Sequence, residues 1–167
     1  MRPFNAMRLR APLRLPENPP WANVVLLLDA SNYANGSTPS GLDVTGKTAT
    51  WVGNAQVKTD NHAPLTGATS SLYFDGAGDY ITFADAADWA MGTGDWTIEA
   101  WICPDFTGQE RYFLSQATAL GAFYAFLFGV NSSPNFFPRI SNGATTYSLG
   151  TAGACPSGTW VHVGASR

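Results

Sequence analysis

The chain has few of the side chains that catalytic and metal sites commonly use. Its 167 residues include two histidines, two cysteines and three glutamates, and only 13% of them are charged. The histidines, His62 and His162, lack the spacing of zinc ligands. No glycine-rich loop opens a helix to hold a phosphate, and no nucleophile elbow is present. The sequence therefore excludes the common zinc, nucleotide-binding and serine hydrolase motifs.

Long apolar runs and secretory signals are also missing. A run such as Val24–Leu28 is far shorter than the roughly 20 residues of a membrane-spanning helix, and we predict no membrane span. Arginines and prolines interrupt residues 1–20, so no signal peptide is seen there. Cys103 and Cys155 could form one disulfide, but nothing indicates an oxidising compartment. We therefore expect two reduced, partly buried thiols.

Glycine, proline and aromatic residues are plentiful. The chain contains 17 glycines and 11 prolines, and aromatic residues make up 13% of it. This composition is typical of an all-β sandwich with many turns. Charge is unevenly distributed, because residues 1–20 hold four arginines and one glutamate, whereas the remainder holds five basic and eleven acidic residues. The acidic charge of the chain after residue 20 argues against a nucleic acid partner.

Residues 1–20 are typical of an extended basic arm that ends at Pro19-Pro20. Prolines spoil the amphipathic helix that a mitochondrial presequence would need. One interpretation is a disordered basic tail. The other, which we adopt, is an anchor that orders against an acidic, partly apolar neighbour, because apolar side chains lie between the arginines. The predicted anchor residues are Arg2, Phe4, Arg8, Leu9, Arg10, Leu13 and Arg14.

Short apolar and β-branched runs bounded by turn residues predict strands along the rest of the chain. We expect the first at Trp21–Asp29; because its apolar run is continuous, we expect it to be covered on both faces or to meet the arm. Residues 30–46 and 59–69 are expected to be polar loops. Between them, Lys47–Lys58 is expected to form a hairpin that turns at Gly53-Asn54.

The stretch from residue 70 to residue 104 carries the clearest β signals. Leu72–Phe74 and Asp79–Phe83 flank a glycine-containing break and predict a second hairpin. Asp95–Ile102 alternates in character, so its two faces can be assigned. One face carries Trp96, Ile98, Ala100 and Ile102, and the other carries Thr97, Glu99 and Trp101.

Further strands are predicted in the second half of the chain. Ala122–Val130 is the most apolar and is expected to be central. Asn135–Ser141 contains Pro138, which predicts an edge or irregular strand because proline cannot donate to a ladder. The other expected strands are Arg111–Ser115, Thr145–Leu149 after an Asn142-Gly143 turn, and Gly158–Ser166. Alternation predicts these buried side chains: Phe74, Ile81, Trp96, Ile98, Phe126, Phe128, Val161 and Val163.

Three motifs follow one another in a recognisable order. They are LYFDGAGDYITF at 72–83, GDWTIEAWICP at 94–104 and TWVHV at 159–163. Together they resemble the laminin G-like domains of the concanavalin A-like lectin/glucanase superfamily, of the kind common in bacterial surface proteins and bacteriophage tail proteins. The resemblance covers residues 22–167. It implies a jelly-roll-like antiparallel β-sandwich, which we assign to residues 21–167 after the arm at 1–20.

Asp75 and Asp79 are candidate calcium ligands. They flank a Gly-Ala-Gly turn, and the resemblance implies calcium at a loop edge in related domains. Calcium takes roughly six to eight oxygen ligands, so two aspartates supply only part of a site. Asp85, Asp88 and Asp95 lie close in sequence and could contribute. The alternative is that both aspartates cap the turn through hydrogen bonds to the backbone. We predict no other cofactor.

Glycosidases of this superfamily use two carboxylates that face each other across a cleft, several of them in a Glu-x-Asp-x-x-Glu strand motif. Here Glu99 is followed by Ala100-Trp101-Ile102-Cys103, so we predict that the protein is not an enzyme. Glu99 itself has two interpretations. It is either a half-exposed or structural carboxylate, in the latter case paired with a cation such as His162 or Arg167, or a ligand contact on the concave sheet.

The resemblance and the arm together predict a non-enzymatic structural or adhesion module. We expect a bacteriophage virion component, a fibre, decoration or adaptor protein, held to other virion proteins by the arm. The alternative is a carbohydrate-binding module for a cell-surface glycan, which needs an exposed aromatic platform with polar neighbours or a calcium site. Related domains continue past a strand like 160–163, so either the chain is cut short or the domain lacks later strands. In the second case we expect unpaired edges that a homo-oligomer would cover.

Overall fold

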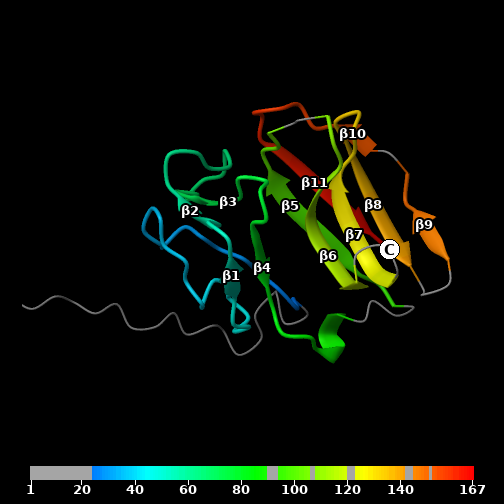
Figure 1. Ribbon diagram of the computed structural model, residues 1–167, viewed down its shortest axis with the longest axis horizontal. Coiled ribbons are helices and arrows are strands. Elements are labelled where there is room, and N and C mark those ends of the chain that lie inside the picture. The colour runs from blue at the N-terminus through cyan, green and yellow to red at the C-terminus, as the bar shows by residue number, and fades with distance from the viewer. Residues whose placement is uncertain (1–23, 90–93, 106–107, 120–122, 142–144, 151) are drawn as a thin grey trace, which may run out of the picture.

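The computed structural model describes residues 24–89, 94–105, 108–119, 123–141, 145–150 and 152–167 (Figure 1). These residues form eleven strands and a single turn of 3-10 helix, η1 (Ala87–Trp89), without an α-helix. Every strand pairing is antiparallel, which confirms the predicted all-β fold. The described part of the chain contains no helix long and apolar enough to cross a membrane. The arm at 1–20 and its boundary with the domain lie outside the described residues.

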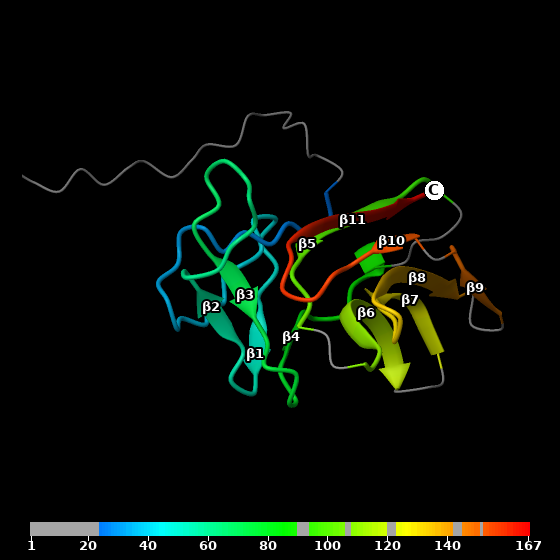
Figure 2. The same ribbon diagram turned by 90° about the horizontal axis from the view of Figure 1, so that it is seen from above.

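Two antiparallel sheets face each other and form the sandwich (Figures 1 and 2). The larger sheet consists of β6 (Arg111–Ala119), β7 (Phe123–Val130), β8 (Asn135–Ser141), β9 (Thr146–Ser148) and β10 (Ala152–Ala154). Both β9 and β10 pair with β8, at opposite ends of that strand. The smaller sheet consists of β5 (Thr97–Ile102) and β11 (Val161–Ser166).

An aromatic cluster fills the space between the two sheets. Phe128 of β7 is fully buried, and the ring of Trp96 meets it edge-on with centroids 6.4 Å apart. Phe136 of β8 stacks beside it at 6.1 Å. Burial of one such side chain contributes about 1.5–3 kcal/mol. The prediction that the most apolar strand is central is therefore confirmed.

Four short strands form an antiparallel ribbon beside the sandwich (Figure 1). They are β1 (Thr50–Val52), β2 (Gln56–Lys58), β3 (Ser71–Tyr73) and β4 (Tyr80–Thr82). Strand β1 pairs with β4, and β2 pairs with β3. Both predicted hairpins are therefore wrong, because neither β1 and β2 nor β3 and β4 are paired. The two glycine-containing breaks interrupt the ribbon and close no hairpin.

A second, smaller core lies beneath the ribbon. Leu42 and Val57 are 1% and 0% exposed, and Trp51, Leu72 and Ile81 pack against this cluster. Trp51 lies opposite Ile81, and Val57 lies opposite Leu72. Because opposite residues of an antiparallel pair share a face, this register brings the apolar side chains of the ribbon together over Leu42.

The predicted core is confirmed in part. The predicted residues that are buried are Phe126, Phe128 and Val163. Those that pack partly buried against the main cluster are Trp96, Ile98 and Val161. Ile81 is partly buried in the second cluster. The prediction for Phe74 is wrong, since its side chain is 44% exposed. The ribbon is interrupted at that residue, so alternation along the strand no longer determines where its side chain points.

The first strand predicted at Trp21–Asp29 is wrong for the residues described. Only Leu28 forms an isolated bridge, with Asp43. Four side chains of the apolar run are 36–39% exposed: Val24, Val25, Leu27 and Leu28. Two backbone hydrogen bonds, from Val44 N–H to Leu27 O at 2.8 Å and from Asp29 N–H to Leu42 O at 3.3 Å, hold the segment together with side chains. The buried Asp43 carboxylate accepts the Leu27 N–H at 2.8 Å, and Lys47 Nζ donates to a carbonyl of the run at 2.7 Å.

Strand β8 lies inside its sheet although it contains Pro138, which corrects the predicted edge position. The Pro138 carbonyl accepts the Leu149 N–H at 3.0 Å, so the proline nitrogen faces that same side. On that side β8 changes partner, from β10 at residues 135–136 to β9 at 139–141. The missing N–H therefore costs no bond to β7. The Asn142-Gly143 turn lies outside the described residues, but the strands on either side of it pair.

Candidate functional site

The outer face of the β5–β11 sheet collects the polar and aromatic side chains of both strands. The strands pair in register, from Thr97 opposite Ser166 to Ile102 opposite Val161. Because successive residues point to opposite faces, one set packs on the core and the other faces outward. The outward set, which we call the Trp101 face, consists of Thr97, Glu99, Trp101, His162, Gly164 and Ser166. The face assignment made from the sequence is confirmed.

Glu99, Trp101 and His162 form a contiguous cluster on this face. The rings of His162 and Trp101 have centroids 5.3 Å apart and planes inclined by 35°. His162 Nε2 lies 3.5 Å from Glu99 Oε2, and these two side chains are 47% and 65% exposed. Of the two partners expected for Glu99, the structure places His162 beside it. An ion pair so exposed contributes at most about 1 kcal/mol when the imidazole is protonated.

A loop from the ribbon lies beside the start of β11 (Figure 2). The indole Nε1 of Trp160 donates to Asn61 Oδ1 at 2.7 Å, although the two residues are 99 positions apart. The Asn61 carbonyl in turn accepts the Ser71 hydroxyl at 2.7 Å. Sequence reasoning missed this contact, because an asparagine in a polar loop carries no sign of so distant a partner.

The Trp101 face offers the contacts that a sugar uses. An indole presents an apolar surface together with one polar edge. The Glu99 carboxylate accepts hydrogen bonds from hydroxyl groups, and the His162 imidazole can donate or accept them. The alternative is that Trp101 and His162 merely stabilise the sheet as a cross-strand pair, which is worth about 0.2–1 kcal/mol. The two roles differ in whether removal of Trp101 affects binding.

Asp75 and Asp79 lie together in the interruption of the ribbon. Asp79 Oδ1 accepts the Asn54 N–H and Oδ2 accepts the Asp75 N–H, both at 2.8 Å. Asp75 Oδ2 accepts the Asn54 side-chain amide at 2.9 Å, and Oδ1 accepts the Ala77 N–H at 2.7 Å. The Asn54 amide, followed by the Ala77 N–H, holds the pKa of Asp75 below its usual value. These bonds connect the two strands of the ribbon at the gap between the β1–β4 pair and the β2–β3 pair.

Calcium fits this loop poorly, because each of the four carboxylate oxygens already accepts an N–H group. Across the described ranges, no group of three or more histidine, cysteine, aspartate or glutamate side chains could hold a metal ion. Asp88 is engaged elsewhere, 3.1 Å from Lys47 Nζ. The geometry favours the turn-capping role, and calcium at Asp75 and Asp79 stays a prediction.

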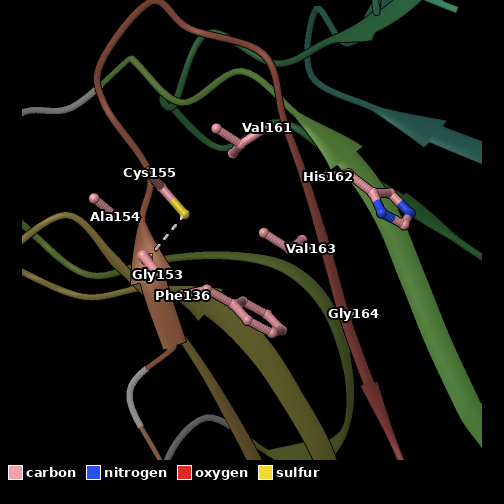
Figure 3. A pocket seen from close by; sticks show the side chains of 8 residues that line it. All are labelled: Phe136, Gly153, Ala154, Cys155, Val161, His162, Val163 and Gly164. Carbon is pink, nitrogen blue, oxygen red and sulfur yellow. Dashed lines mark hydrogen bonds between the residues drawn. The ribbon is translucent and has the colours of Figure 1, made fainter.

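A cavity of about 220 Å³ opens between β10 and β11 (Figure 3). Its lining includes the apolar side chains of Phe136, Cys155, Val161 and Val163, and the His162 ring points away from them. Burial raises the pKa of Cys155, so this thiol stays protonated and unreactive near neutral pH. Cys103 and Cys155 are both free, as expected. The cavity offers mainly apolar side chains and an unreactive thiol, so it is a weaker candidate than the Trp101 face.

Comparison with known proteins identifies the family. A laminin G model, described as the concanavalin A-like lectin/glucanases superfamily, matches residues 75–167, more than half of the chain. The match contains every strand of the sandwich, from β5 to β11. No curated protein and no solved structure matches the chain. The chain belongs to the laminin G-like family of the concanavalin A-like lectin/glucanase superfamily.

Proposed function

We propose that this chain is a non-enzymatic carbohydrate-binding and adhesion module whose Trp101 face contacts the glycan. Family membership supports a carbohydrate-binding or adhesion-type module. The observation that carries the choice of site is the cluster of the exposed Glu99 and His162 side chains with the partly buried ring of Trp101. It combines an aromatic ring with an exposed carboxylate and an imidazole, which is the platform that a lectin needs.

Catalysis is not part of this proposal. A two-carboxylate glycosidase needs an acid and a base or nucleophile about 5–9.5 Å apart. Glu99 lies beside His162 on the outer face. Glu110 accepts the Tyr112 hydroxyl at 2.7 Å and lies 3.8 Å from Arg139. Glu99 thus lies beside an imidazole and Glu110 beside a guanidinium, an arrangement that supports structural and binding roles.

We also propose that the module works in a bacteriophage virion, as a fibre, decoration or adaptor protein. The motif resemblance supports this setting, and so do the four arginines of residues 1–20 that precede an acidic body. The arm would hold the module to other virion proteins. Deletion of residues 1–20 should leave the melting temperature unchanged and abolish incorporation into particles. Incorporation of the shortened chain at the level of the full chain would contradict the anchor.

The glycan-binding proposal is tested by screening the full chain on a glycan array and titrating the bound glycans. Trp101→Ala should lower the affinity roughly tenfold or more, because a central aromatic anchor typically contributes over about 1 kcal/mol. Tyr147→Ala removes an aromatic side chain that is 51% exposed on β9, and it should leave the affinity unchanged. Equal binding by the Trp101 variant and the unmodified chain would rule out the Trp101 face.

A further inference from the structure

The ribbon presents a second group of exposed side chains, on strands other than those of the Trp101 face. Tyr73 of β3 and Tyr80 of β4 are 44% and 50% exposed. Their neighbours Leu72 and Ile81 pack against the second core, so the two tyrosines point outward by alternation. The register places Gln56 opposite Tyr73 on the same face. We call Gln56, Lys58, Tyr73 and Tyr80 the tyrosine face.

A fixed loop separates the two tyrosines. The chain between them contains Asp75 and Asp79. Both carboxylates accept hydrogen bonds from Asn54, which lies between β1 and β2 on the opposite strand of the ribbon. Asp79 also accepts the Asp75 N–H at 2.8 Å. These hydrogen bonds set the spacing of the two rings, so the surface is formed before any ligand arrives.

Lys58 gives this surface its charge preference. Its Nζ lies 5.5 Å from the centroid of the Tyr73 ring. It forms no ion pair with a carboxylate of the described residues, whereas Lys47 Nζ pairs with Asp88 at 3.1 Å. Beyond residue 20 the chain contains eleven acidic and five basic residues, so Lys58 is one of few cations in this part of the chain. An ammonium group beside an exposed aromatic ring is complementary to an anion attached to a ring-shaped, partly apolar ligand.

We propose that the tyrosine face binds an acidic glycan through a single carboxylated sugar. The sugar carboxylate pairs with Lys58, and the sugar ring packs on Tyr73. The following sugars extend toward Tyr80, where the charges of Asp75 and Asp79 repel a second acid group and favour neutral hydroxyl groups. The ligand class is thus an oligosaccharide with one acidic sugar next to neutral ones, bound independently of the Trp101 face.

The test compares oligosaccharides that contain one uronic or sialic acid with the methyl esters of the same compounds. The ester keeps the shape of the sugar and removes its charge. In titrations of the full chain, at least one acid should bind roughly tenfold more tightly than its ester, because only the acid forms a charge-assisted hydrogen bond with Lys58. Added salt should reduce this preference.

Four variants decide between the possible outcomes. Lys58→Gln should abolish the preference for the acid, and Lys58→Arg should keep it. Tyr73→Ala should weaken binding of both acid and ester, whereas Tyr147→Ala should change neither. Melting temperatures identify any variant that fails to fold.

Several results would overturn the proposal. They are equal binding of acid and ester, an unchanged preference in Lys58→Gln, or failure of every acid in the panel to bind. Capture of a protein partner that Tyr73→Ala alone abolishes would assign the tyrosine face to protein contacts. Trp101→Ala should leave acid binding intact, so failure of the Trp101 face and failure of the tyrosine face can be told apart.

Discussion

Asp79 and Gly53 fit together across the interruption of the ribbon. Gly53 has a φ of 76°, in the left-handed region where a Cβ is costly. A Cβ at this position would also overlap the Asp79 carboxylate. That carboxylate accepts the N–H of the next residue, Asn54, at 2.8 Å. The bond that joins the two halves of the ribbon therefore depends on the space that a glycine leaves.

Gly53→Ala should destabilise the fold more than Gly67→Ala. Both glycines have positive φ, 76° and 89°, so each alanine costs about 1–2 kcal/mol in backbone strain. Only Gly53 adds an overlap, whereas a Cβ on Gly67 meets nothing within 4 Å. We expect a further loss of about 1 kcal/mol or more at Gly53 in urea denaturation. This excess should vanish when Asp79 is alanine, and its persistence would implicate another contact.

The Asp43 carboxylate should make the fold sensitive to acid. Burial raises the pKa of Asp43, but hydrogen bonds from Thr45, Leu27 and Lys47 outweigh burial and hold it below 3.8. A lowered native pKa means that the unfolded chain takes up the proton first. The stability that the ionised Asp43 carboxylate adds is therefore complete above the unfolded pKa of about 3.9. It is lost as pH falls through the pKa of Asp43 in the folded protein.

Asp43→Asn tests this role. The side-chain NH2 of asparagine would face backbone N–H groups that the carboxylate now accepts. We therefore expect the free energy of unfolding to fall by about 1–3 kcal/mol at neutral pH. Urea denaturation from about pH 7 to pH 2 should show the stabilities of the two proteins converging below about pH 4. A difference that stays constant down to the lowest pH would mean that titration of Asp43 is not responsible.

Two tryptophans on opposite sides of the β5 segment should respond differently to truncation. Trp96 packs on Phe128 in the main core, so Trp96→Ala should cost on the order of 3–5 kcal/mol. Trp101 contacts His162 on the outer face, so Trp101→Ala should cost about 1 kcal/mol or less. Urea denaturation measures both losses. A loss below about 1 kcal/mol for Trp96 would refute its inward assignment.

Cys155 should resist thiol reagents while Cys103 reacts. Cys155 is 1% exposed, and burial raises its pKa; Cys103 is partly exposed. A chromogenic thiol reagent should therefore modify a single thiol in the native chain and both in denaturant. Cys103→Ser should remove the native reaction. Rapid native labelling of that variant would show that the Cys155 side of the sandwich opens.

The sequence by itself determined where most strands lie and which way β5 and β11 face. Alternation with a period of two is a local property, so Trp96 inward and Glu99 and Trp101 outward followed from residue order alone. The family could also be recognised from the sequence, because its motifs are continuous stretches of chain. For the candidate site, the sequence indicated Glu99 and a possible partner in His162, and it suggested that Asp75 and Asp79 share one turn.

Only the tertiary structure decided which strands pair and which side chains meet. Any two strands can form the same backbone hydrogen bonds, so the choice depends on packing between distant residues. In the ribbon, Trp51 with Ile81 and Val57 with Leu72 come together over one core. The contact between the His162 and Trp101 rings depends likewise on the register of β5 and β11. These contacts join residues far apart in the chain, and their free energy exists only once the whole fold holds them together.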